Sequence, residues 1–163
     1  MLVVLRGNSG SGKSTVAAAL QAALGRPTAV LEQDHFRRVV YNERTDGSAP
    51  DGMAHADLLE AAAAHALGRG QHVVLEGILN AAQYGAMLQR VAAQADRARF
   101  FAFDLPFEET ARRHAGRTKA GDFDVDEMRS WYHGWDPLPF VAEERITADE
   151  DVAGVVQRIL GRV

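Results

Sequence analysis

Short apolar runs alternate along this chain with segments of helical periodicity. Four runs are predicted as strands, and a short fifth strand follows near the end: residues 2–6, 28–32, 72–76, 98–104 and 143–147. The first four runs are nearly continuous in apolar residues, which is typical of strands that are covered on both faces. The pattern therefore predicts a parallel sheet packed between helices.

Between the strands, apolar residues recur every three or four positions, as on the inner face of a helix. In residues 13–24, Val16, Leu20 and Leu24 share one face, and Gly25 is suited to end the helix. Helices are predicted over residues 13–24, 35–41, 57–67, 81–95, 106–117, 125–134 and 151–160. The fold class is α/β: a single doubly wound parallel sheet of about five strands, with helices on both faces, in one domain over residues 1–163.

Composition narrows the class of protein. The 163 residues are 47% hydrophobic and 25% charged, as in ordinary globular proteins. The lack of cysteine excludes disulfides and zinc–thiolate sites, and the first residues lack the features of a signal peptide. We expect a cytoplasmic protein without a membrane partner. The formal net charge of −4 argues against tight, sequence-blind binding to nucleic acid, although a local basic groove stays open.

The stretch GNSGSGKST, residues 7–15, follows the first predicted strand and opens the first predicted helix. It fits the phosphate-binding loop pattern G-x-x-x-x-G-K-[ST]. Glycines let backbone N–H groups turn toward a phosphate, the lysine brings a charge to the β and γ phosphates, and the next hydroxyl can coordinate Mg²⁺. We predict that ATP and Mg²⁺ bind at Gly7, Asn8, Ser9, Gly10, Ser11, Gly12, Lys13, Ser14 and Thr15.

Such a loop is shared by GTPases, motor ATPases and kinases, so other features must separate these classes. Residues 118–122, TKAGD, miss the guanine-reading pattern Asn/Thr-Lys-x-Asp of GTPases by one residue. The ABC-type signature and the extra helical domain of AAA-type ATPases are absent, and the chain is short for either class. A small kinase remains.

The chain resembles the small P-loop kinases of the zeta-toxin, chloramphenicol phosphotransferase and polynucleotide 5′-kinase type. The resemblance rests on residues 7–15, on Asp34 after the second strand, on VVLEG at residues 73–77, and on a basic helix after the fourth strand. It implies the strand order 2-3-1-4-5 and a lid over about residues 112–135.

Asp34 lies at the carboxyl end of the second predicted strand, at the edge where doubly wound sheets bind ligands. Asp34 can accept the proton of an attacking hydroxyl, as the Asp at this place does in the kinases it resembles. Arg37 follows at the Asp-x-x-Arg spacing of the polynucleotide kinase type, and this resemblance implies that it helps to hold the substrate. The alternative is that Asp34 only caps the following helix and that Arg37 is solvated.

Glu76 ends the third strand, where a Walker-B acid would stand. It can hold a Mg²⁺-bound water together with Ser14, or contact the substrate as the base in place of Asp34. The alternative is a strand-end charge that faces solvent.

The predicted lid begins with a basic cluster of five residues: Arg112, Arg113, His114, Arg117 and Lys119. Arginines of such a lid neutralise charge on the transferring phosphoryl group in the kinases it resembles. We favour Arg113 and Arg117, which share a helix face, with Arg112 as the alternate. A solvated helix face that pairs with Glu108 and Glu109 is the other interpretation.

Three aromatic residues, Trp131, Tyr132 and Trp135, gather at the end of the predicted lid. They could stack on a planar substrate, but we favour a packing role.

The functional hypothesis is transfer of the γ-phosphate of ATP to a hydroxyl of a small molecule, such as an antibiotic, a nucleoside or a sugar. The negative charge favours this acceptor over a polynucleotide end, which stays open as an alternative. A toxin-like or regulatory ATP-binding protein with little transfer activity is the third hypothesis. The sequence leaves the oligomeric state undetermined.

Overall fold

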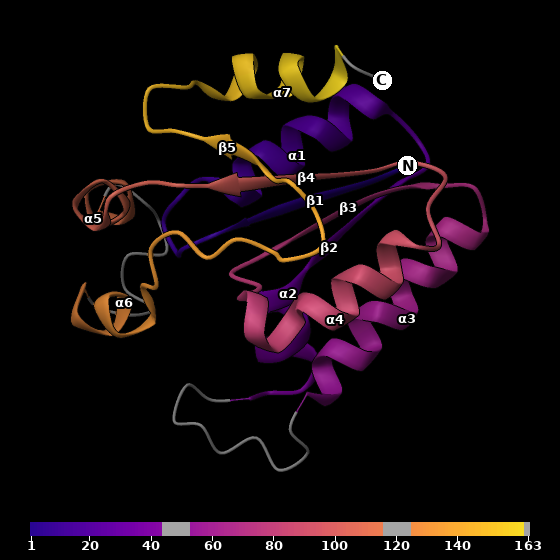
Figure 1. Cartoon of the computed structure of the whole chain (residues 1–163), viewed down its shortest axis with the longest axis horizontal. Coiled ribbons are helices and arrows are strands. Elements are labelled where there is room, and N and C mark those ends of the chain that lie inside the picture. Colours follow the sequence, from indigo (N-terminus) through magenta and orange to yellow (C-terminus); the bar gives the residue numbers. More distant parts are fainter. Residues whose placement is uncertain (44–52, 116–124, 162–163) are drawn as a thin grey trace.

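A computed structural model describes residues 1–43, 53–115 and 125–161 of the chain. Its strands form one parallel sheet in the order β2-β3-β1-β4-β5, as the resemblance predicted (Figure 1). The strands are β1 Leu2–Gly7, β2 Thr28–Glu32, β3 His72–Gly77, β4 Ala98–Phe103 and β5 Glu144–Ile146. The helices are α1 Lys13–Leu24, α2 Gln33–His35, α3 Ala54–Gly68, α4 Ala81–Ala92, α5 Phe107–Ala115, α6 Val125–Trp131 and α7 Val152–Leu160, with a π-helix, η1, at Phe36–Val40.

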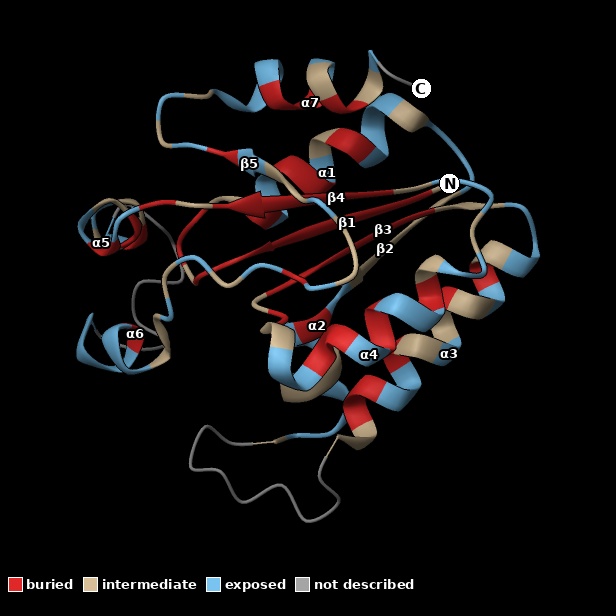
Figure 2. Cartoon of the chain, in the orientation of Figure 1, coloured by how far each residue is buried: buried red, intermediate tan, exposed pale blue. Residues whose placement is uncertain are grey.

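Helices cover both faces of the sheet, as the apolar strands predicted. Val3 and Leu5 of β1 pack in the cluster that includes α1 and α7, while Leu2 and Val4 pack in the cluster that includes α3 and α4. Figure 2 shows the central strands buried between these two layers. A strand that is buried on both faces needs apolar residues at consecutive positions, which explains the unbroken run at residues 2–5.

Because the strands pair in parallel, their carboxyl ends lie at one edge of the sheet. Leu5 of β1 lies beside Glu76 of β3, which in turn lies beside Glu32 of β2. On the other side of β1, Gly7 lies beside Phe103 of β4. The loop after β1, Glu76 and the residues after β2 therefore meet at this edge, and α5 and α6 lie beyond it (Figure 1).

The helix predicted after β2 differs from the structure in its type, and the helices predicted over residues 81–95 and 125–134 end earlier, at Ala92 and Trp131. The segment after β2 is a short helix, α2, that contains Asp34 and continues into the π-helix η1. The N-cap of α2 is Glu32, so Asp34 lies inside the first turn and does not cap a helix that follows it. Single-turn π segments are rare and are frequent at functional sites, which draws attention to this edge.

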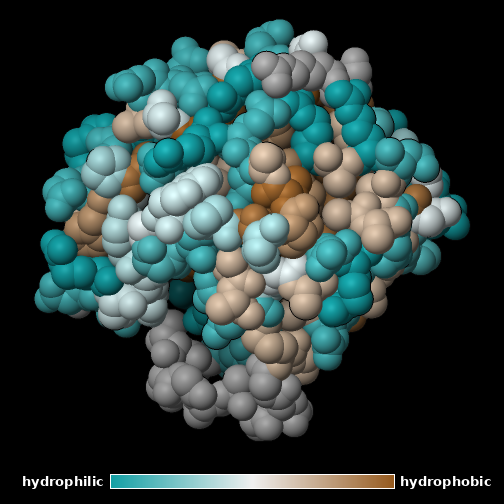
Figure 3. All heavy atoms as spheres, in the orientation of Figure 1, coloured by the Kyte–Doolittle hydropathy of each residue, from teal (hydrophilic) through white to brown (hydrophobic). Residues whose placement is uncertain are grey.

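The surface is uneven in polarity. On the face seen in Figure 3, hydrophobic residues gather over the alanine-rich helices α3 and α4, and hydrophilic residues dominate around α5 and α6. In the described parts of the chain, every helix is too short or too polar to cross a membrane.

Candidate functional site

Three glycines give the loop between β1 and α1 a backbone that other residues rarely adopt. Gly7, Gly10 and Gly12 have φ values of 143°, 80° and 105°. A Cβ at Gly7 would lie 2.8 Å from the Cβ of Phe103, and one at Gly10 would lie 2.5 Å from the carbonyl oxygen of Thr110. Conformations of this kind turn successive N–H groups toward one point and create an anion-binding nest.

Lys13 opens α1 and folds back over this loop. Its side chain is buried, and its Nζ donates a hydrogen bond of 2.9 Å to the carbonyl oxygen of Asn8 and lies 3.4 Å from Oγ of Ser11. The N-cap of α1 is Gly12, whose lack of a side chain leaves the first-turn amides uncapped by an oxygen. The ammonium group and the helix N-terminus therefore place positive charge at the nest.

Ser14 and Glu76 are brought together as the sequence predicted. The Ser14 hydroxyl donates a 2.6 Å hydrogen bond to Oε1 of Glu76, which is 5% exposed. Burial raises the pKa of Glu76, although Lys13 and the Ser14 hydrogen bond act in the opposite direction. A hydroxyl beside a carboxylate offers the oxygen ligands that Mg²⁺ prefers, so these two residues fit a magnesium ion that arrives with a nucleotide.

Asp34 lies at the same edge and is accessible. Its carboxylate raises the pKa of Glu76, and its Oδ2 is 3.2 Å from Nε of Arg38 in a half-exposed ion pair. The Arg38 guanidinium also lies 5.7 Å from the ring centre of Trp131 at the end of α6. Arg37 is half-buried, and its positive charge opposes the effect of burial, which raises the pKa of Tyr84.

Two arginines of the basic cluster, Arg112 and Arg113, are described and have different surroundings. Arg113 donates hydrogen bonds of 3.1 Å to the carbonyl oxygens of Ser11 and Ala148, so it contacts the phosphate-binding loop directly. Arg112 is exposed and binds Glu109, which also accepts a 2.5 Å hydrogen bond from Nε of Arg113. The hydrogen bonds from Arg112 and then Arg113 lower the pKa of Glu109 to about 2.

Each interpretation of the basic helix therefore applies to one arginine. Arg112 lies on a solvated face and pairs with Glu109, whereas Arg113 contacts the phosphate-binding loop. Arg117 and Lys119 lie outside the described residues.

The aromatic cluster has packing partners. Tyr132 donates a 2.9 Å hydrogen bond to the carbonyl oxygen of Leu105 and packs edge-on against Phe107 at a ring-centre distance of 5.5 Å. Trp135 lies beneath the guanidinium of Arg145, 4.5 Å from ring centre to charge. The contacts of Tyr132 agree with a packing role, whereas Trp135 is 39% exposed and its partner Arg145 also lies at the surface.

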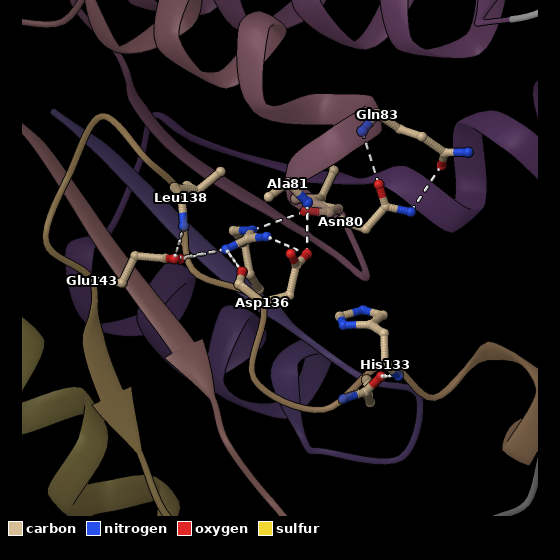
Figure 4. Close-up of polar contacts among 10 residues, drawn as sticks. Asn80, Ala81, Gln83, His133, Asp136, Leu138 and Glu143 are labelled. Carbon is tan, nitrogen blue, oxygen red and sulfur yellow. Dashed lines mark hydrogen bonds and ion pairs between the residues drawn. The ribbon is translucent and has the colours of Figure 1, made fainter.

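A buried network around Arg6 is a feature that the sequence did not lead us to expect (Figure 4). Arg6, the residue before the loop, is 2% exposed and donates a 2.8 Å hydrogen bond to the carbonyl oxygen of Leu79. Its Nη1 binds both oxygens of Glu143, at 2.7 and 2.8 Å, and its Nη2 lies 3.2 Å from Oδ2 of Asp136. The same Asp136 oxygen accepts a 2.7 Å hydrogen bond from the backbone N–H of Ala81.

This network fixes the loop that follows α6 against the phosphate-binding loop. The backbone N–H of His133 donates a 3.1 Å hydrogen bond to the side chain of Asn8, so the two loops also touch directly. A signal was present in the sequence, because an arginine inside the apolar run LVVLRG must have carboxylate partners when it is buried. Those partners lie 130 and 137 positions away, and sequence spacing cannot identify them.

The fold and the loop together define a P-loop nucleotide-binding domain. The sequence matches a family model described as an AAA domain, AAA_33, over residues 2–131, and the chain belongs to this family. The match covers residues 2–131, which run from β1 through α6. The extra helical domain for which we looked in the sequence, as a mark of AAA-type ATPases, is not part of this match.

Several solved structures with this fold are named as kinases. A protein described as a kinase from Chloroflexus aurantiacus has 19% identity and a TM-score of 0.75, and the match covers 99% of this chain and 94% of that chain. A gluconokinase from Sinorhizobium meliloti has 20% identity and a TM-score of 0.65, with coverages of 98% and 89%. The APS kinase of Mycobacterium tuberculosis, in complex with AMPPNP and APS, has 24% identity and a TM-score of 0.69, with coverages of 98% and 95%.

At these identities the structures establish the P-loop kinase fold of the chain. No protein with a curated function matches the sequence.

Proposed function

We propose that this protein is an ATP-dependent kinase that transfers the γ-phosphate to a hydroxyl group of a small-molecule acceptor. One observation carries the proposal: the Ser14 hydroxyl lies 2.6 Å from the buried Glu76 carboxylate, at the mouth of the glycine nest that Lys13 covers. In the proposal, the loop amides and the Lys13 ammonium group would bind the phosphates, and the oxygens of Ser14 and Glu76 would bind Mg²⁺.

The nucleotide-binding roles follow from these positions. Lys13 and the amides of residues 7–15 would hold the β and γ phosphates, and Lys13 exchanges its contact with the Asn8 carbonyl for phosphate oxygens. Ser14 and Glu76 would hold Mg²⁺ directly or through water, and Mg²⁺ supplies positive charge that offsets the charge on the phosphates.

The acceptor would bind on the β2 side of the nest. Asp34 would take the proton of the attacking hydroxyl, because it is accessible and lies at the same sheet edge as Glu76. Arg37, three residues after Asp34 and half-buried, would hold a polar or anionic group of the acceptor. Glu76 is the second candidate for the base, and its hydrogen bond to Ser14 favours the metal role.

Closure would involve the lid, about residues 112–135. Arg113 would keep the start of the lid against the loop through the Ser11 carbonyl, or turn to the phosphates, and Arg117 would supply a further charge.

Two facts support a small acceptor. The net charge of −4 opposes the salt-dependent attraction on which polynucleotide binding relies. The similar gluconokinase and APS kinase are named for small substrates, and the second was solved with APS bound.

The test measures ADP and phosphorylated product with MgATP and a panel of sugars, nucleosides, antibiotics and oligonucleotides with free 5′-hydroxyls. We expect one class of small acceptor to stimulate ADP formation. Stimulation by oligonucleotides alone would instead identify a polynucleotide-end kinase. Nucleotide binding without stimulation by any acceptor would favour a regulatory ATP-binding protein.

Asp34→Asn separates binding from transfer. We expect it to bind MgATP like the wild type while kcat falls by about 10²–10⁴-fold, since general-base catalysis contributes that much. The charge-matched control is Asp149→Asn, an exposed residue in the turn after β5. Full transfer by Asp34→Asn together with its loss in Glu76→Gln would move the base to Glu76.

A further inference from the structure

Four polar side chains form a buried row beneath the acceptor side of the site. Nε2 of Gln33 donates a 2.9 Å hydrogen bond to the hydroxyl of Tyr84, which lies 2.8 Å from Nε2 of His55. Nδ1 of His55 in turn lies 2.9 Å from Oε1 of Glu43. Gln33, His55 and Tyr84 are 3%, 3% and 4% exposed, so water cannot replace these bonds.

His55 links the two ends of this row: Nδ1 contacts the Glu43 carboxylate and Nε2 contacts the Tyr84 hydroxyl, and the tautomer of the ring decides which atom donates at each contact. The Tyr84 oxygen keeps a lone pair for the Gln33 amide, and each bond fixes the next. Burial raises the pKa of Tyr84 to about 12, which keeps its hydroxyl protonated.

The row ends directly beside Asp34. Gln33 is the first residue of α2, and its side chain is held between Tyr84 of α4 and the end of β3. A Cβ at Gly77 would lie only 2.6 Å from the Cβ of Gln33, so no space is left on that side. The backbone that enters Asp34 is therefore fixed on one side by a hydrogen bond and on the other by steric contact.

We infer that Tyr84 is a positioning residue: through Gln33 it fixes the start of α2 and holds the Asp34 carboxylate at the distance that phosphoryl transfer requires. This inference rests on the proposed function for its catalytic consequence. Displacement of a reacting group by about 1 Å can cost about 10²-fold in rate, so a row of this kind can control kcat without touching the substrate.

The test is Tyr84→Phe, which removes one hydroxyl and keeps the ring. We expect kcat to fall by about tenfold or more, with the KM for MgATP within about twofold of the wild type, because the phosphate-binding loop is untouched. We also expect faster amide hydrogen exchange at residues 34–38. In the double variant Tyr84→Phe/Asp34→Asn, kcat should equal that of Asp34→Asn alone, because Tyr84 acts through Asp34.

Two further variants guard against a purely structural explanation. Gln33→Met keeps the volume of the side chain but removes the donor, and should reproduce the exchange and kcat changes even if Tyr84→Phe folds poorly. Tyr132→Phe removes a hydroxyl bonded to the Leu105 carbonyl, and should leave exchange at residues 34–38 at the wild-type rate.

Three outcomes would overturn the inference: unchanged exchange at residues 34–38, exchange that rises only in α3 and α4, or additive loss of kcat in the double variant. If the wild type transfers no phosphate, the proposed function fails, and the exchange data still decide whether Tyr84 positions α2.

Discussion

Arg6 shows how much a single buried charge can determine in this fold. Its guanidinium is almost fully buried and binds Glu143, whose side chain is 0% exposed, as well as Asp136. Removal of one partner from a buried ion pair leaves the other charge without compensation, which costs about 3–5 kcal/mol. The network therefore holds the loop after α6 in place, and the loop depends on Arg6.

Arg6→Ala is expected to lower the free energy of unfolding in urea by about 3–5 kcal/mol. The matched control is Arg90→Ala, which breaks another two-bond pair, with Glu60, at a site where the arginine is 57% exposed. An exposed pair contributes at most about 1 kcal/mol. Equal losses in the two variants would contradict the importance of burial here.

Glu76 gives the protein a pH dependence of definite sign. Its pKa is raised by burial, so the folded state favours the protonated form more than the unfolded state does. The stabilising contribution is complete at low pH and is lost as pH rises through the raised pKa. Each tenfold difference in proton affinity between the folded and unfolded states corresponds to about 1.4 kcal/mol of stability.

We expect Glu76→Gln to remove this loss, so its free energy of unfolding without nucleotide should exceed that of the wild type at neutral pH but not in acid. Urea unfolding at a series of pH values measures the difference. Glu60→Gln is a control of opposite sign. The hydrogen bond from Arg90 lowers the pKa of Glu60, so the stability that Glu60 contributes is present at neutral pH and is lost in acid. A difference between Glu76→Gln and the wild type that does not change with pH would refute this account.

At the scale of elements, the phosphate-binding loop is packed against α5. A Cβ at Gly10 would meet the Thr110 carbonyl at 2.5 Å, whereas a Cβ at Gly70 would meet nothing within 4 Å, although both residues have positive φ. Each alanine substitution incurs the strain of the left-handed conformation, about 1–2 kcal/mol. Only the one at Gly10 also pushes two elements apart.

Gly10→Ala is therefore expected to weaken MgATP binding by at least about tenfold, which is about 1.4 kcal/mol. Gly70→Ala should lose stability alone and bind MgATP like the wild type. Titration calorimetry gives both affinities, and equal affinities would show that the packing of the loop on α5 does not matter for binding.

The elements also show what a sequence can predict. Unbroken apolar runs such as residues 2–5 and 73–75 identified the buried strands, and the pattern of residues 7–15 identified the loop, because both signals are local. The π-helix after Asp34 was predicted as an ordinary helix, since residues 36–40 carry no local signal for it. The partners of Arg6 and Tyr84 come from distant parts of the chain, and only the fold shows them.

At the scale of the whole molecule, the parallel sheet explains why the predicted site residues meet. Lys13, Asp34 and Glu76 follow or end three different strands, and the order β2-β3-β1 brings these strand ends together at one edge. Strand order came from the resemblance, whereas the meeting of the residues follows from the geometry of a doubly wound sheet. The acceptor has no comparable signature, because its selection depends on side chains from several loops.

The central claim is that the nest after β1 binds a magnesium nucleotide through its phosphates. Calorimetric titration of the wild type and of Lys13→Ala with MgATP tests it most directly. We predict saturable heat for the wild type and none for Lys13→Ala, with both proteins folded by circular dichroism. Equal binding by the two proteins, or no heat from the wild type at millimolar MgATP, would contradict the account.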